Sequence, residues 1–186
     1  MKFPEILKPY QGIIYFVIAL LIANYFWKFT VSGDENGSLV LFFGLNISSP
    51  FVFMASHIAR VTHSVLNFFG FDVVLYPKNV LRYANHNNVW IAWGCTGLKQ
   101  TFIFTVIMLI AKGSWQKKLW YIPLGWVFIY IINMTRIITI TAVIKTHPEL
   151  FILLHEYLFK YIFYILIFLV WVFWEEKIIK KEATKE

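Results

Sequence analysis

Several apolar runs, each about as long as a transmembrane helix, constrain the fold of this chain more than any other feature. The runs at 10–30, 90–111, 119–145 and 150–174 can each cross a hydrocarbon core roughly 30 Å thick. The chain is 59% hydrophobic and 20% aromatic, which is too apolar for a soluble domain of this size. The sequence therefore predicts an all-α polytopic integral membrane protein, with about four transmembrane helices in a single membrane domain over 1–186.

The segment 50–70 differs from these runs because polar and apolar residues alternate along it at helical spacing. The polar residues are His57, Arg60, Ser64 and Asn67, and the apolar ones opposite them are Phe53, Ile58, Val61, Val65 and Phe68. Such a helix more often lies in the membrane interface than across the bilayer. We expect it to begin near Pro50 and to stop near Gly70. The next segment, 71–89, has short β-type runs around a turn, which predicts a small hairpin or irregular loop outside the lipid.

Basic residues set the expected orientation in the membrane. The net charge is +7, and membrane proteins keep their excess of Lys and Arg in cytoplasmic loops. The loop 112–118 has three lysines and no acid, so we expect it in the cytoplasm, together with the N-terminus and the basic tail. The turn at 146–149 and the start of the 90–111 run then face outward, provided that 39–89 makes no net crossing. The sequence has no basic patch interleaved with exposed aromatic residues, so nothing in it indicates binding to nucleic acid.

The one cysteine, Cys95, and two groups that are costly in lipid, Arg136 and His155, fall in the last three apolar runs. At about 1.5 Å of helix rise per residue, Cys95 and His155 lie roughly 8–10 Å below the outer ends of their runs. Arg136 lies roughly 15 Å deep by the same measure, and its long stem lifts the guanidinium toward the interface. The runs are consecutive and joined by short turns. We therefore expect the three groups to meet in the outer leaflet.

A thiol between two cations has a clear chemical use. Arg136 and protonated His155 would lower the pKa of Cys95 and favour the thiolate. Cys95 would attack a carbonyl to form a thioester, and Arg136 would stabilise the oxyanion. His155 would protonate the leaving amine and later activate the resolving nucleophile.

Four neighbours of these groups could support them. Asn133 is one turn before Arg136 and could orient it, and Lys99 is one turn beyond Cys95 and adds positive potential. Gly94 and Gly97 would let an extended peptide approach the thiol closely.

Other interpretations of the same residues remain open. A lone membrane cysteine can be inert packing, and Arg136, Lys99 and His155 would also suit the polar path of a small transporter or channel component. A non-enzymatic assembly factor would tolerate replacement of all three polar groups. His57 and Arg60 fit the wet face of the 50–70 helix, with substrate binding as an alternative role. A single cysteine forms no intramolecular disulfide and no cysteine-based zinc site, and we expect neither a metal nor a cofactor.

Three motifs, taken in order, resemble the signature of the exosortase/archaeosortase family. They are Cys95-Thr96-Gly97-Leu98 followed by Lys99, then Asn133-Met134-Thr135-Arg136, and then His155. In that family a Cys-small-Gly motif, an Asn-x-x-Arg motif and a His or Arg lie on successive membrane helices. The resemblance covers roughly 50–160 and makes this chain similar to a short, single-domain member.

The resemblance implies a membrane-embedded cysteine protease or transpeptidase in the plasma membrane, with its active site on the extracytoplasmic side. Its implied catalytic residues are Cys95, Arg136 and His155. Its implied partners, besides the lipid bilayer, are secreted proteins that end in a short motif, a hydrophobic helix and a basic tail. Such an enzyme would cleave these C-terminal sorting signals through a thioester on Cys95.

Overall fold

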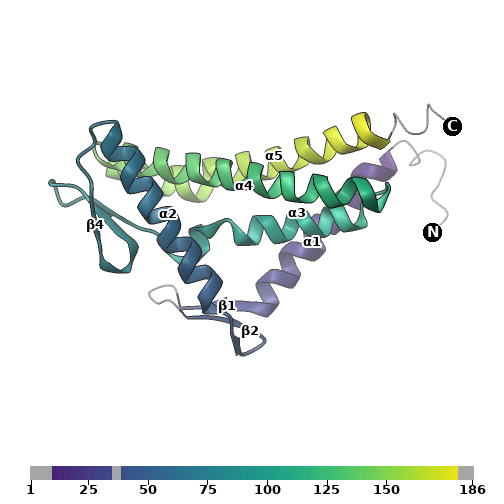
Figure 1. The fold of residues 1–186 in the computed structure, drawn as a ribbon, viewed down its shortest axis with the longest axis horizontal. Helices are drawn as coiled ribbons and strands as arrows, with labels where there is room; N and C mark the ends of the chain where they lie inside the picture. The colour runs from purple at the N-terminus through teal and green to yellow at the C-terminus, as the bar shows by residue number, and fades with distance from the viewer. Residues whose placement is uncertain (1–9, 35–38, 180–186) are drawn as a thin grey trace.

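A layer of three helices forms the main body of the protein (Figure 1). The computed structural model describes residues 10–34 and 39–179. In Figure 1, α3, α4 and α5 run alongside one another, whereas α1 and α2 lean away from this layer and approach each other near β1 and β2. The helices are α1 (Gln11–Thr30), α2 (Ser48–Phe68), α3 (Leu98–Ile110), α4 (Trp115–Ile144) and α5 (Phe159–Phe173).

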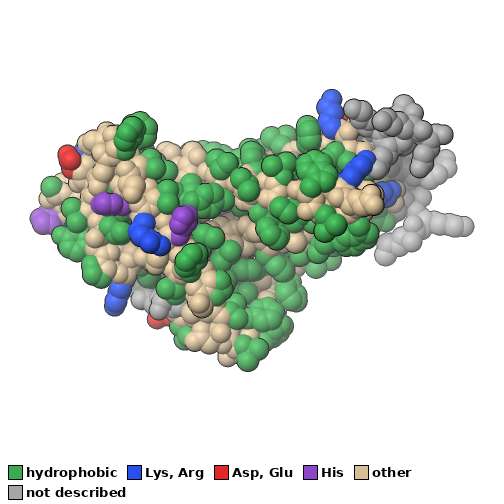
Figure 2. All heavy atoms as spheres, in the orientation of Figure 1, with side chains coloured by type: hydrophobic (Ala, Val, Ile, Leu, Met, Phe, Trp, Pro, Cys, Tyr) green, Lys and Arg blue, Asp and Glu red, His purple; other side chains and the backbone are tan. Residues whose placement is uncertain are grey.

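Three helical segments of the described residues are long and apolar enough to cross a membrane: Gln11–Thr30, Trp115–Ile144 and Pro148–Ile179. The last contains α5, extended by the π-helical turns Leu153–Leu158 and Trp174–Ile179. Figure 2 shows hydrophobic side chains covering much of the visible face, with charged and histidine side chains gathered toward its two ends. This architecture agrees with the predicted helical membrane class. The N-terminus and the end of the basic tail, which we expect in the cytoplasm, lie outside the described residues.

The predicted span over 90–111 is shorter in the structure. Trp90 ends a β-strand, a 3₁₀ turn follows at Trp93–Thr96, and α3 covers only the 13 residues Leu98–Ile110. Gly97, between the turn and the helix, has a φ of 77°, a left-handed conformation that stops a helix from continuing through it. Hydropathy counts the apolar residues of strand, turn and helix as one run, so it could not separate them.

Two small antiparallel sheets connect the helices. The first contains β1 (Val31–Gly33), β2 (Val40–Phe42) and β3 (Leu45–Asn46). The second contains β4 (Val74–Tyr76), β5 (Val80–Arg82) and β6 (Asn88–Trp90), with Val74 opposite Arg82 and Val80 opposite Trp90. The hairpin or loop predicted over 71–89 is therefore a three-stranded sheet, and its third strand leads directly to Cys95.

Helix α2 occupies nearly the predicted range, but it buries only part of the predicted apolar face, including Ile58. It ends at Phe68, and Gly70 follows with a φ of 77°, a common way for a helix to stop. Phe53 and Phe68, expected on the apolar face, are 66% and 85% exposed. The helix packs instead through a face with several small residues, which lets it approach its neighbours closely; its buried residues are Phe51, Ala55, Ile58, Ala59, Thr62 and Leu66.

The two largest clusters of buried hydrophobic residues hold most of these elements in place. One joins α1, α3, α4 and α5 through buried aromatic and aliphatic side chains such as Phe104 and Trp171. The other joins α2, the second sheet and α4 through Ile58, Leu81 and Ile137. Cys95 packs against this second core. The turn that carries the thiol is therefore fixed to α4.

Candidate active site

Backbone and side-chain hydrogen bonds fix Cys95 in the turn before α3. Its amide nitrogen donates to the Ala92 carbonyl at 3.0 Å, and the Asn133 side-chain amide donates to the Cys95 carbonyl at 2.8 Å. A Cβ at Gly97 would lie 3.2 Å from Cγ of Asn133. Because Gly97 has no side chain and adopts a left-handed conformation, Asn133 of α4 can come close enough to hydrogen-bond to the backbone of Cys95. Asn133, which we expected to orient Arg136, holds Cys95 instead.

His155 lies beside the thiol, as the sequence predicts. Its Nε2 is 3.9 Å from Sγ of Cys95, and its Nδ1 is 2.9 Å from a carboxylate oxygen of Glu156. The ring of Phe151 stacks on the imidazole with centroids 5.2 Å apart. A carboxylate at Nδ1 favours the tautomer with its proton there, which leaves the lone pair of Nε2 directed to the sulfur. The order of cysteine, histidine and glutamate suits a nucleophile, a base and an orienting acid.

Arg136 lines the same cavity as Cys95 and His155. Its side chain is buried, with 8% of its surface exposed, and its Nε has no hydrogen-bond partner among the described residues. The cavity has a volume of about 480 Å³. A buried guanidinium with a free donor can bind an incoming carbonyl or carboxylate oxygen. The lining residues are Ala92, Trp93, Gly94, Cys95, Lys99, Gln100, Arg136, His155, Glu156, Phe159, Lys160, Phe163 and Tyr164.

Two opposing effects act on the thiol. Burial raises the pKa of Cys95, and the positive charge of Arg136 lowers it, with the net change upward. Burial disfavours the charged form because a thiolate loses its hydration. The expected lowering by Arg136 is therefore present, but burial outweighs it.

The supporting residues predicted from the sequence lie around the same cavity. Lys99 occupies the first turn of α3 and lines the cavity next to Gln100, whose side-chain oxygen is buried without a partner in the described structure. A Cβ at Gly94 would meet no atom within 4 Å, so the space beside the thiol is open at that point. Gly97 is needed for the left-handed turn and not for the approach of a ligand.

His57 and Arg60 do not line the cavity of Cys95. Nε2 of His57 lies 2.8 Å from the hydroxyl of Tyr130, which ties α2 to α4, and Nε of Arg60 donates to the Ser56 carbonyl at 3.3 Å. Their contacts are structural.

Glu156 and Lys160 are cavity residues that sequence reasoning did not single out. Glu156 directly follows His155, and Lys160 follows it by one helical turn. Charges four residues apart at the start of an apolar run could have indicated a polar wall.

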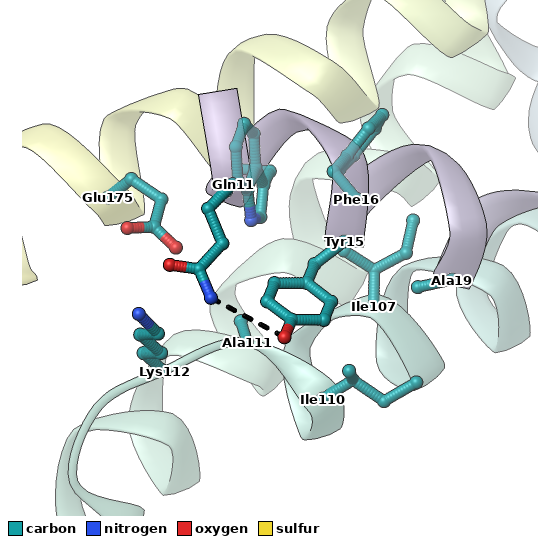
Figure 3. Close-up of a pocket in the computed structure, with 11 residues that line it drawn as sticks. Gln11, Tyr15, Phe16, Ala19, Ile107, Ile110, Ala111, Lys112 and Glu175 are labelled. Atoms are coloured by element: carbon teal, nitrogen blue, oxygen red, sulfur yellow. Dashed lines mark hydrogen bonds between the residues drawn. The ribbon is translucent and has the colours of Figure 1, made fainter. Parts of the chain in front are cut away.

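A second cavity lies at the far end of α1, α3 and α5 (Figure 3). It has a volume of about 350 Å³ and contains Gln11, Tyr15, Lys112 and Glu175 in its lining. Nε2 of Gln11 donates to the hydroxyl of Tyr15 at 3.4 Å. No thiol or imidazole lines this cavity. Among the described residues no cluster of three His, Cys, Asp or Glu is placed to bind a metal ion.

Comparison with known protein families gives a match to an established family. The family model described as transmembrane exosortase matches residues 36–172. That range contains Cys95, Arg136 and His155 and covers more than half of the chain. No curated protein and no solved structure gave a match.

Proposed function

This chain belongs to the transmembrane exosortase family, whose members are membrane-embedded sorting transpeptidases or proteases that act on secreted proteins, and from that premise we propose that Cys95 is its nucleophile. The observation that carries the proposal is the 3.9 Å separation of Cys95 Sγ and His155 Nε2, with Glu156 on the other ring nitrogen. A base oriented by an acid is what a thiol of raised pKa needs.

The first step makes a thioester. As Sγ of Cys95 attacks the carbonyl carbon of the scissile peptide bond, the thiol proton moves to Nε2 of His155. The bond from carbon to nitrogen then breaks, and the imidazolium gives its proton to the leaving amine. The C-terminal helix of the substrate leaves with that amine, and the remaining protein stays on Cys95 as an acyl group.

Arg136 and His155 have further roles in this scheme. Arg136 stabilises the negative charge on the carbonyl oxygen through its buried donors, which is strongest where water is excluded. In the second step His155 takes a proton from water or from an acceptor amine, which attacks the thioester and releases the thiol. The first nucleophile gives hydrolysis and the second gives transpeptidation.

The substrates in this proposal are secreted proteins with a C-terminal motif, a hydrophobic helix and a basic tail. The lysines of 112–118 favour a cytoplasmic position for that loop. Helix α3 lies between this loop and Cys95. The reaction would therefore take place at the extracytoplasmic side of the plasma membrane.

The direct test replaces the nucleophile. Membranes that contain the wild type or Cys95→Ala are incubated with a reporter that ends in the C-terminal segment of a secreted protein from the same cells. We expect the wild type to shorten the reporter and Cys95→Ala to leave it intact, with both variants present at equal levels. Thr135→Ala is the matched control, since Thr135 is exposed on α4 and bonds only its own helix. Full processing by Cys95→Ala would exclude the proposed nucleophile and leave Arg136 and Lys99 as a polar path.

A further inference from the structure

A third cavity adjoins the cavity of Cys95 and lies between α2 and the second sheet. Its volume is about 360 Å³, and its walls come from α2, from the turn after β4 and from the segment that follows β6. The mechanism above uses none of its side chains. The lining residues are Phe51, Val52, Ala55, Ser56, Lys78, Asn79, Trp90, Ile91, Ala92 and Trp93.

This cavity and the cavity of Cys95 share a wall. Ala92 and Trp93 line both of them, and the Ala92 carbonyl accepts the hydrogen bond from the amide of Cys95. The two cavities are therefore adjacent, and Cys95 follows their shared wall by two residues in the sequence. The cavity of Cys95 is also lined by α3 and α5 residues such as Gln100 and Tyr164, and α5 belongs to a helix long and apolar enough to span the membrane.

The shared wall is held firmly in place. The ring of Trp93 meets that of Phe51 edge-on at 6.0 Å between centroids. A Cβ at Gly33 would lie only 2.8 Å from Cε2 of Trp93, so the backbone of β1 presses against the indole. The hydroxyl of Thr96 donates to the Trp93 carbonyl at 2.7 Å. These three contacts hold the shared wall in a fixed position relative to the thiol.

The opposite wall has an unusual backbone. Lys78 and Asn79 both have a φ of 62°, and a left-handed conformation at a residue other than glycine carries a cost that tends to be retained at functional sites. The carbonyl of Asn79 accepts a hydrogen bond from Ile91 at 3.0 Å, which locks the turn to the chain entering the active site. Lys78 is exposed and is the single charged residue in the lining.

We propose that this cavity, bounded by α2, Lys78–Asn79 and Trp90–Trp93, binds the segment of the substrate that precedes the scissile bond. The inference rests on the proposed function and adds the place and chemistry of recognition. The hydrophobic helix of the substrate occupies the side of α3 and α5, and the preceding residues run in extended form over Ala92 into the second cavity. There the indoles and Phe51 contact uncharged side chains, and Lys78 repels basic ones.

The first test fills the cavity without touching the catalytic groups. Ser56→Phe places a ring in the cavity, and Ser64→Phe, an exposed position on the same helix, is the matched control. We expect Ser56→Phe to lower processing of the reporter by about 10- to 200-fold, the usual effect of a mismatch in a specificity pocket, with Ser64→Phe near the wild-type rate. The alkylation rate of Cys95 by iodoacetamide should be equal in all three proteins, which shows that the active site remains folded. Equal processing by Ser56→Phe and the wild type would overturn the proposal.

The second test reverses the charge. Reporters with a single lysine placed at successive positions before the cleavage site should include one that the wild type processes poorly and Lys78→Glu processes well. If the wild type and Lys78→Glu process every lysine-containing reporter equally well, the proposed role of Lys78 is wrong.

A third measurement separates binding from catalysis. A photo-crosslinker at Val52 in the Cys95→Ala variant should capture the reporter at residues before the cleavage site, while the same crosslinker at Ser64 should not. Reporter cleaved in a Cys95-dependent way but never captured from Val52 would defeat this inference alone. Reporter captured from Val52 but cleaved equally by Cys95→Ala would defeat the proposed function alone.

Discussion

Cys95 is a thiol on which burial and charge act in opposite directions. Burial raises its pKa more than Arg136 lowers it, which favours the neutral thiol. In the proposed mechanism His155, whose Nε2 lies 3.9 Å from the sulfur, is the base at the moment of attack. The thiol proton would then leave as the new bond forms, and a stable thiolate is not required.

This balance predicts how the reactivity of Cys95 depends on pH. Since its pKa lies above the usual value of about 8.5, the alkylation rate with iodoacetamide should climb by about tenfold per pH unit through the neutral range and beyond pH 8.5. Arg136→Gln removes the cation that lowers the pKa, so its rate at each pH should fall below that of the wild type. Because the chain has one cysteine, the labelled amount reports on this residue alone.

A plateau of the alkylation rate below pH 8 would contradict this description, because it would mean a stable thiolate near neutrality. Cys95→Ala supplies the blank for the labelling. A rate unaffected by Arg136→Gln would show that the guanidinium does not act on the thiol.

At the same scale, the sequence predicts the candidate catalytic residues better than their neighbours. Arg136 and His155 can be identified because each is costly in an apolar run, and Cys95 because it is the one cysteine of the sequence. The role of Asn133 at the Cys95 carbonyl could not be derived, since it depends on a left-handed turn that changes where the backbone points. A role for Glu156 could not be predicted from the sequence, because charged residues are common at the ends of membrane spans.

At the scale of elements, the turn before α3 decides the geometry of the site. Strand β6 ends at Trp90, and α3 starts at Leu98, so Cys95 lies at the end of a helix layer rather than inside a helix. A long apolar run predicts a span but gives no sign of a break at Gly97. The helix over 48–68 could be predicted because polar spacing and a terminal glycine mark it, whereas its buried face is set by packing against α4 and the second sheet.

The two glycines around Cys95 provide a test of this turn. Gly97→Ala forces a side chain into a left-handed conformation and toward Asn133, and we expect a loss of about 1–3 kcal/mol in stability. Gly94→Ala adds a methyl group to open space and should change stability by less than about 0.5 kcal/mol. Thermal unfolding in detergent measures both.

Activity separates the two variants further. Gly94→Ala narrows the space beside the thiol, so its KM for the reporter should rise while its melting temperature stays the same. A Gly97→Ala variant as stable as the wild type would show that the left-handed turn is not needed.

At the scale of the whole molecule, the active site and the lysine loop lie at opposite ends of α3. Cys95 precedes its first residue, and Lys112 follows its last. Nζ of Lys118 donates to the carbonyls of Leu109 and Ala111, so this lysine also satisfies the end of α3. The other two lysines of the loop, Lys112 and Lys117, also have the positive charge that favours a cytoplasmic position.

Thiol labelling in intact cells tests this orientation. A membrane-impermeant methanethiosulfonate reagent should label Cys95 of the wild type from outside. In a Cys95→Ala background, Ser114→Cys places a thiol in the exposed lysine loop, and it should react only after the membrane is permeabilised. The reverse pattern would place the active site in the cytoplasm and exclude processing after export.

The central claim is that the substrate becomes covalently attached to Cys95. Wild-type membranes are mixed with the reporter, quenched in acid within the first turnover, and analysed by mass spectrometry of the peptide that contains Cys95. We expect an acyl adduct on Cys95 that hydroxylamine removes, and no adduct when the His155→Ala variant is used under the same conditions. Cleaved reporter without any adduct on Cys95 at any quench time would contradict it.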